Sequence, residues 1–218
     1  MGTALQPYLY APASVGAPEV FVEDTPEGGE TGGETGGETG GATGGTATST
    51  VVEAPANAQT VTVDFNAVDG TGLPVKANYV AGTTNSGTVS GVACGFLNSY
   101  FSPAVTTDTY SNPGYIMFAS KTAKAPAAVF NTAAFPGTIV SVTVTPASSC
   151  SGSAGWVVNL NSEAYSAAVE SGVTSTGKAA FTAYSPVDAG AKYFDISCTT
   201  TGYNGQMGSI TIVYVPAA

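Results

Sequence analysis

Residues 137–145 read GTIVSVTVT, a stretch in which apolar and hydroxyl side chains alternate. Val140, Val142 and Val144 fall on one face, and the residues between them are a serine and a threonine. Successive side chains of a β-strand point to opposite faces of a sheet, so this period of two predicts a strand with one buried face.

Similar stretches lie on both sides of this one. Alternation recurs in TVTVDFN (residues 60–66), GWVVNLN (155–161), KYFDISC (192–198) and GSITIVYV (208–215). The side chains expected to face a core are Val61, Val63, Phe65, Trp156, Val158, Leu160, Phe194, Ile196, Cys198, Ile210, Ile212 and Tyr214. Further strands are expected near residues 88–96, 115–120, 127–131 and 179–184. Serine and threonine are expected on the outer faces.

Turn-forming residues separate these segments, as strand connections require. They are Asp69-Gly70, Asn85-Ser-Gly87, Asn112-Pro-Gly114, Phe135-Pro-Gly137, Ser185-Pro186 and Tyr203-Asn-Gly205. The best helix candidate, residues 162–171, is short and uncapped, so we expect one turn at most. About eight to ten short strands indicate an all-β fold, a jelly-roll-like β-sandwich that forms a head domain over residues 59–218.

A four-residue repeat precedes the head. Residues 28–45 read GGETGGETGGETGGATGG and contain no large apolar side chain that could repay the cost of ordering the glycines. We therefore expect residues 26–58 to form a flexible linker, or tether. A Gly-rich coil of about 30 residues has a root-mean-square span of roughly 30 Å.

Residues 1–25 contain two apolar clusters in an arm that prolines interrupt. The expected docking residues are Tyr8, Leu9, Tyr10, Val20, Phe21 and Val22. Proline fixes φ and removes a hydrogen-bond donor, which favours an extended peptide. Such a peptide suits a groove or a sheet edge on another protein. The alternatives are a disordered tail and a segment that folds back on its own head.

Charge is distributed unevenly along the chain. Eight of the 15 acidic residues precede residue 54, while the segment after residue 58 has seven acids and five lysines. Arginine and histidine are absent, so the clustered cations of a nucleic-acid interface are missing. The missing histidine also removes the usual general base and the commonest metal ligand. We expect no enzymatic activity, no catalytic residues and no nucleic-acid partner.

Cys94, Cys150 and Cys198 match no zinc-ligand spacing. They are expected to be small buried hydrophobic residues, and one disulfide, between Cys150 and Cys198, is the alternative. No apolar run is long enough for a transmembrane helix, and the N-terminus lacks the features of a signal peptide. A composition typical of extracellular proteins without an export signal suggests a removed signal, another export route, or release in a virus particle.

The C-terminal half resembles known jelly-roll modules. The resemblance is carried by GTIVSVTVT at 137, GWVVNLN at 155, AKYFDISC at 191 and GQMGSITIVYV at 205. Such modules occur in secreted bacterial surface proteins and in virion proteins of tailed phages. The order of a short peptide, a Gly-rich tether and a β head is similar to that of phage head fibres and capsid decoration proteins. The resemblance implies that the peptide grips a capsid or tail protein while the head projects.

Two kinds of ligand are considered for the head. Aromatic faces stack on sugar rings, and the candidate glycan contacts are Tyr100, Phe101, Tyr110 and Tyr203. The alternative is that these rings belong to the core or to subunit contacts. Asp64 and Asp69 offer the oxygen ligands that calcium prefers, although solvated loop acids without a metal are the favoured interpretation, so no cofactor is expected.

The expected function is therefore that of a non-enzymatic virion structural protein. It would be a capsid decoration or fibre subunit, assembled as a homo-oligomer such as a trimer, with possible adhesion to host glycans. The alternative is a secreted or cell-surface bacterial carbohydrate-binding module. A glycosidase using Asp64 with Asp69, or Glu163 with Glu170, is the least favoured hypothesis.

Overall fold

The alternating segments form two facing antiparallel sheets, as expected from their period. The computed structural model describes residues 45–68, 70–119, 127–166, 172–199 and 205–218. Within them the fold is all-β, with two short 3₁₀ turns, η1 (Lys76–Asn78) and η2 (Val187–Ala189). The all-β sandwich expected from the sequence is confirmed.

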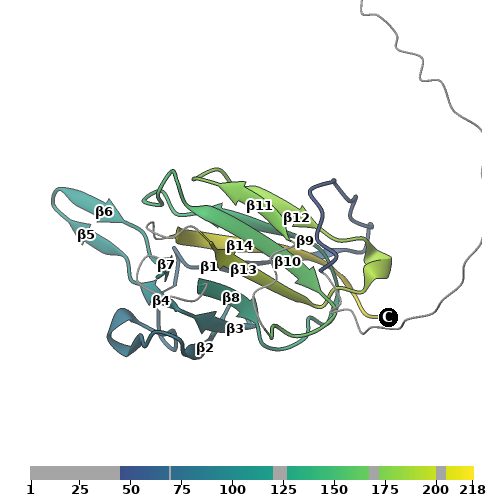
Figure 1. Cartoon of the computed structure of the whole chain (residues 1–218), viewed down its shortest axis with the longest axis horizontal. Helices are drawn as coiled ribbons and strands as arrows, with labels where there is room; N and C mark the ends of the chain where they lie inside the picture. Colours follow the sequence, from purple (N-terminus) through teal and green to yellow (C-terminus); the bar gives the residue numbers. More distant parts are fainter. Residues whose placement is uncertain (1–44, 69, 120–126, 167–171, 200–204) are drawn as a thin grey trace, which may run out of the picture. The chain divides into compact units, whose positions relative to one another are not determined.

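Each of the two main sheets has six strands, and Figure 1 shows the two layers. The first sheet has the order β12-β9-β14-β7-β4, and β1 also pairs with β14. Its strands are β1 (Gln59–Asp64), β4 (Ser99–Ser102), β7 (Tyr115–Phe118), β9 (Gly137–Pro146), β12 (Phe181–Tyr184) and β14 (Gly205–Pro216). The 12-residue β14 is long enough to hold β7 along its first part and β1 along its second part.

The second sheet has the order β11-β10-β13-β8-β3-β2. Its strands are β2 (Thr84–Val89), β3 (Val92–Leu97), β8 (Ala127–Asn131), β10 (Gly155–Asn161), β11 (Val173–Thr176) and β13 (Tyr193–Cys198). A separate hairpin of β5 (Val105–Thr107) and β6 (Tyr110–Asn112) projects from one end of the sandwich (Figure 1).

The core lies between the two sheets and is built from their inward-facing residues. The predicted inward faces of β1, β10, β13 and β14 all contribute to it. Trp156 is 1% exposed, and its ring meets the Phe118 ring edge-on with centroids 5.3 Å apart. Burial of a large aromatic side chain stabilises such a core by a few kcal/mol.

One predicted face, that of β9, is interrupted by a β-bulge. Val213 pairs with Ser141 and Tyr214 with Ile139, so Val140 is an extra residue in the ladder. The bulge shifts the alternation, and Ile139 joins Val142 in the central cluster of the core. The prediction that Val140, Val142 and Val144 share one face is therefore wrong at Val140, although Val140 is buried.

The strand expected near residues 88–96 is in fact a hairpin. β2 and β3 are joined by Ser90 and Gly91, whose φ values are 51° and 78°. Positive φ at both central positions is the geometry of a two-residue type I′ turn. Asn85 and Gly87, expected to form a turn, lie within β2 instead. The sequence pattern also did not predict the short strands β4, β5, β6 and β11.

The head begins earlier than residue 59. The Thr46 N–H donates to the Leu160 carbonyl at 2.9 Å, and Thr48 exchanges two backbone hydrogen bonds with Tyr184, each 2.8 Å long. The Thr46 and Ser185 hydroxyls are also 2.7 Å apart. The C-terminal part of the expected linker is therefore hydrogen-bonded to the sandwich through Thr46 and Thr48. Residues 1–44, and with them the expected peptide and most of the tether, lie outside the described residues.

The outer face of the second sheet is buried where polar exposure was expected. Asn159 and Asp195 are 0% and 1% exposed, respectively. Tyr165, in the connection between β10 and β11, stacks on Phe130 with ring centroids 4.1 Å apart. This connection covers part of the sheet, and residues 162–166 contain no helix; residues 167–171 lie outside the described part of the chain.

Candidate functional site

Several predicted site residues lie where the structure describes no side chain. Tyr8, Leu9, Tyr10, Val20, Phe21, Val22, Asp69 and Tyr203 are outside the described residues, and for Tyr110 only the backbone, in β6, is described. The predicted contacts that can be placed are therefore Tyr100, Phe101 and Asp64.

Phe101 is not a glycan contact. Its side chain is 1% exposed and belongs to the core, because its position in β4 points between the sheets. The Phe101 ring also fills the space beside Gly70, where an added Cβ would lie 2.3 Å from a ring carbon. A buried ring offers no face to a sugar, so this prediction is wrong.

Tyr100, the residue before Phe101 in β4, lies in a cluster of three tyrosines. Its ring centroid is 5.4 Å from that of Tyr79, which follows η1. Burial raises the pKa of Tyr100, and the nearby phenol groups of Tyr115 and Tyr79 raise it further. Tyr100 pairs with Met117 of β7, so Tyr115 lies two residues away on the same face of the sheet. We call Tyr79, Tyr100 and Tyr115 the tyrosine cluster.

The tyrosine cluster is half-buried and retains one unsatisfied polar group. Tyr79, Tyr100 and Tyr115 are each partly exposed. The Tyr79 hydroxyl is buried, with no hydrogen-bond partner among the described residues. A buried phenol usually finds a hydrogen-bond partner, so the Tyr79 hydroxyl is an exception to that rule within the described part of the chain.

A polar hollow of about 570 Å³ adjoins the same loop. Asn78, the residue before Tyr79, lines it together with Thr84 and Asn85 of β2. Pro74 also lines the hollow, and its carbonyl accepts a hydrogen bond from the Phe101 N–H. The hollow is therefore lined by the Asn78 amide of loop 72–79 and by amide and hydroxyl groups of β2, and Tyr79 follows Asn78 in the chain without lining it. Only Tyr100 of this arrangement was predicted, since neither Tyr79 nor Asn78 stands out in the sequence.

A calcium site at Asp64 receives no support from the described residues. The Asp64 Oδ1 accepts hydrogen bonds from the Asn66 N–H at 2.9 Å and the Asn66 Nδ2 at 3.0 Å. This is the geometry of a side chain that closes its own turn. No group of three or more His, Cys, Asp or Glu residues that could hold a metal occurs in the part of the chain that the structure describes.

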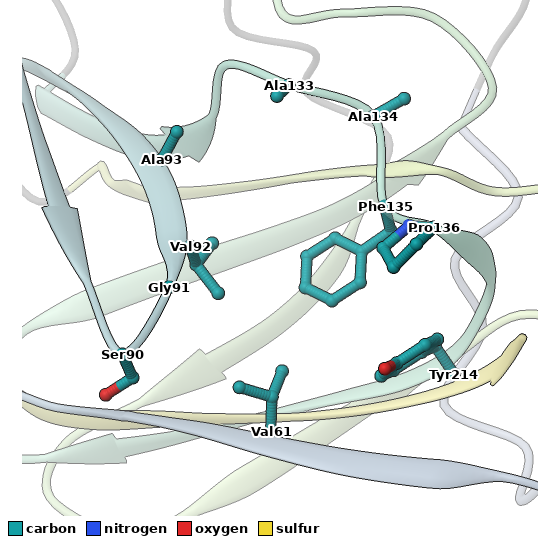
Figure 2. A pocket seen from close by; sticks show the side chains of 10 residues that line it. All are labelled: Val61, Ser90, Gly91, Val92, Ala93, Ala133, Ala134, Phe135, Pro136 and Tyr214. Carbon is teal, nitrogen blue, oxygen red and sulfur yellow. The ribbon is translucent and has the colours of Figure 1, made fainter.

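An apolar groove lies at the open side of the sandwich and is drawn in Figure 2. Val61 of β1 and Tyr214 of β14 line it from the first sheet, and Val92 lines it from the second. Phe135, in the loop between β8 and β9, points its ring between Val92 and Tyr214 (Figure 2), with the Phe135 and Tyr214 ring centroids 5.4 Å apart. The groove has a volume of about 280 Å³ and contains no charged side chain. Sequence analysis did not identify it.

A buried polar cluster lies on the outer face of the second sheet. The Asp195 carboxylate accepts hydrogen bonds from the Asn159 Nδ2 at 2.8 Å and the Asn161 Nδ2 at 3.0 Å. Burial raises the pKa of Asp195, and these two hydrogen bonds partly oppose the effect. Burial and the Asp195 charge likewise raise the pKa of Tyr165. Asn159 and Asp195 of this cluster are at most 1% exposed, so it is enclosed rather than open to a substrate.

The cysteines are buried, and no disulfide joins them. Each is at most 1% exposed. Burial raises the pKa of Cys94 to about 12. The pKa of Cys150 is also raised, chiefly by burial. These thiols therefore serve as small apolar groups of the core, in agreement with the first of the two predicted alternatives.

No protein-family model matches this sequence, and no curated protein matches it significantly. Within the described residues, no helix is both long and apolar enough to cross a membrane. The candidate sites therefore rest on geometry alone, and they are the tyrosine cluster with its polar hollow and the apolar groove.

Proposed function

We propose that this chain is a non-enzymatic virion structural protein, a capsid decoration or fibre subunit. The observation that carries the proposal is the order of parts along the chain. A β-sandwich with its own core is preceded by a Gly-rich repeat, and the repeat is preceded by a peptide that contains aromatic residues. In this proposal residues 1–25 anchor the subunit to a capsid or tail protein, and the sandwich is displayed on the virion.

We further infer that the framework of the head is a jelly roll. The supporting observation is that β1-β14-β9-β12 and β8-β13-β10-β11 are neighbours in the two sheets, while β8, β9 and β10 alternate between the sheets. First and last strands that pair, with consecutive strands that cross between the sheets, are features of double Greek-key sandwiches. In this interpretation β2–β7 form an insertion between the first and second framework strands.

An oligomer, such as the trimer expected for a fibre, is also proposed. β1 pairs with β14 along one edge, and no described strand pairs with its other edge. Apart from Asp64 at its end, β1 carries no charge or proline that would discourage further pairing. Contacts between subunits are one way to cover such an edge.

The anchor is tested by particle incorporation. Deletion of residues 1–24 should leave a folded head that no longer joins particles in an assembly reaction with the capsid or tail components. A second test variant is the full chain with Tyr8, Leu9 and Tyr10 changed to serine. Its matched control is the full chain with Ala11 and Ala13 changed to serine. The first should fail to incorporate and the second should succeed. Normal incorporation of the truncated protein would refute the anchor.

A second function, saccharide binding by the head, is favoured by the tyrosine cluster and the hollow beside it. Tyrosine rings supply stacking faces, and Asn78, Thr84 and Asn85 supply donors and acceptors for sugar hydroxyls. This function fits a virion that adheres to host glycans. It equally fits the alternative of a secreted or cell-surface bacterial carbohydrate-binding module.

Saccharide binding is tested on a glycan array with the full chain. A glycan that binds selectively should lose about tenfold in affinity, or ~1.4 kcal/mol, when Tyr100→Ala removes one stacking face. Tyr193→Ala, at another partly exposed tyrosine, is the matched control and should bind normally. Binding that is equal in both variants would place the sugar elsewhere, and an array without selective binding would remove this function.

A further inference from the structure

The first sheet has three edge strands, and the described chain bonds its own backbone to two of them. Tyr184 of β12 exchanges two hydrogen bonds with Thr48, each 2.8 Å long. Phe101 of β4 forms a bridge with Val75, and its N–H donates to the Pro74 carbonyl at 2.6 Å. The third edge strand, β1, has β14 as its only strand partner within the described residues. An open edge of this kind is a template for pairing with another chain.

The hydrogen bonds beside β1 show which of its residues face the open edge. The Phe65 N–H, directly after the strand, donates to the Gly208 carbonyl at 2.9 Å. Bonded pairs alternate along an antiparallel ladder, so the odd-numbered residues of β1 bond to β14. The backbone N–H and C=O groups of Thr60, Thr62 and Asp64 therefore point to the open edge. The described part of the chain supplies no hydrogen-bond partner for them.

We propose that a second copy of this chain pairs with this edge, β1 against β1 in antiparallel orientation, about a two-fold axis at Thr62. In this dimer the two Thr62 residues lie directly opposite each other, and Thr60 of each copy faces Asp64 of the other. About six backbone hydrogen bonds join the copies, two for each facing pair. The first sheets of the two copies become one continuous sheet.

The ends of β1 favour this register over its neighbours. Asp64 is the only charged residue of the strand, and axes nearer to it bring two carboxylates opposite or diagonal to each other. Axes nearer the start of the strand pair the edge with Ala58, whose N–H already donates to the Pro55 carbonyl at 2.9 Å. An axis at Thr62 avoids both conflicts, because Asp64 then faces the neutral Thr60.

The side chains on both faces of β1 suit the same pairing. Thr62 is exposed, and its hydroxyl oxygen is 3.4 Å from that of Thr211 on the outer face. A second Thr62 continues this row of threonines, and threonine pairs stabilise neighbouring strands. On the inner face Val61 is opposite Val63 of the second copy. Val61 is partly exposed and points into the apolar groove (Figure 2), so the dimer covers apolar surface that the single chain leaves open.

This inference rests on the oligomer of the proposed function and names its contact. A two-fold axis gives a dimer, so a trimer in solution would retain an oligomer but overturn this contact. Particle incorporation tests the anchor at residues 1–25 separately. Failure of the anchor and failure of the β1 contact are therefore distinguishable.

Sedimentation equilibrium of the full-length chain measures the dimer. Thr62→Lys should weaken dimerisation by at least about tenfold, because the axis places the two introduced charges opposite each other. Thr60→Lys, at an exposed residue on the same face, is the matched control. It should dimerise at least as well as the parent, since its cation faces Asp64. A mixture of Thr62→Lys and Thr62→Glu should restore the dimer.

Cysteine cross-linking tests the register directly. With oxidised glutathione as the oxidant, Thr62→Cys should form a disulfide-linked dimer, because the Cα atoms of a bonded pair are about 5.5 Å apart. Thr60→Cys is the matched control, since its two introduced thiols lie roughly 13 Å apart along the strands and should not link. The native cysteines are each at most 1% exposed, so they do not compete.

Each outcome decides the question. A dimer that Thr62→Lys dissociates, that the mixture restores, and that cross-links at position 62 but not at position 60 supports the proposal. A chain that is monomeric up to about 100 μM, a trimer, or a dimer that survives Thr62→Lys overturns it. Cross-linking at both positions, or at neither, also overturns it. Circular dichroism verifies that the variants are folded, and if Thr62→Lys is not, the cross-link alone decides.

Discussion

At the scale of single residues, Asp195 is the most unusual group of the head. It is a carboxylate that is 1% exposed, and its hydrogen-bond donors are two neutral amides. A buried charge without a cationic partner is costly, so burial favours the protonated form. Asp195 therefore couples the stability of the head to pH.

The sign of this coupling is testable with Asp195→Asn. Because the folded pKa of Asp195 is raised, its stabilising contribution is complete below the unfolded pKa, about 3.9, and is lost as the pH rises through the folded pKa. The variant does not titrate there, but it loses an acceptor for Asn159 or Asn161. We expect it to be less stable than the parent at about pH 4, with a smaller difference near pH 7.

Urea unfolding of both proteins over this pH range measures the difference in the free energy of unfolding. A difference that stays constant with pH, or grows toward pH 7, would show that burial does not disfavour the charged carboxylate.

The cysteines provide a second prediction at this scale. The pKa of Cys94, raised to about 12, leaves almost no thiolate near neutral pH, and all three side chains are buried. We expect a thiol reagent to modify the native protein very slowly. In denaturant, without a reductant, three equivalents should react, as counted by mass spectrometry. A single reactive equivalent after unfolding would reveal a disulfide, and a rapid reaction in the native state would contradict the burial.

At the scale of elements, the pairing of β9 with β14 depends on a glycine. Gly137 begins β9, and an added Cβ there would lie 2.0 Å from the Val215 carbonyl oxygen. The obstacle is backbone, so a side chain at this position requires the strands to move apart. The nearby bulge at Val140 already shifts the register of the same pair.

Gly137→Ala should therefore destabilise the head by about 1–3 kcal/mol, the usual cost of overpacking. Gly152→Ala is the matched control, since nothing lies within 4 Å of its added Cβ, and it should be neutral or slightly stabilising. Chemical denaturation of the two variants gives the comparison. Equal stability would mean that β9 and β14 separate at little cost.

At the scale of the whole molecule, the boundary of the head is open to test. Thr46 and Thr48 together make five hydrogen bonds of 2.7–3.1 Å to Leu160, Tyr184 and Ser185. Hydrogen bonds of this kind contribute about 0.5–1.5 kcal/mol each. Residues 45–58 are therefore expected to stabilise the sandwich rather than to act as a spacer.

A fragment of residues 59–218 should consequently have a melting temperature several degrees below that of residues 45–218. Scanning calorimetry of the two fragments measures this. Thr46→Val with Thr48→Val, in the longer fragment, removes the hydroxyl groups alone and should reproduce only part of the loss, because three of the five bonds are made by the backbone. Identical melting temperatures of the two fragments would show that residues 45–58 do not stabilise the head, as expected for a domain that begins at residue 59.

Sequence reasoning succeeded where burial of one strand face requires apolar side chains at alternate positions. The alternation in β1, β10, β13 and β14 reflects burial on one face, and period two is visible in any window of five or more residues. It found the four-residue strands β7 and β12 but missed β4, β5, β6 and β11, because strands of three or four residues are too short to show a clear period. It also missed the groove, whose walls at Val61, Val92 and Phe135 are far apart in the chain.

What the sequence determined by itself is the all-β class, the burial of Trp156 in the core, and the absence of histidine and arginine chemistry. These follow from composition and from local periodicity. Only the tertiary structure decided that Phe101 is buried, that Tyr79 and Tyr100 meet, that Val140 bulges, and that Thr46 belongs to the head. Each of these depends on which strands become neighbours, and that choice is made by packing between segments that are distant in the chain.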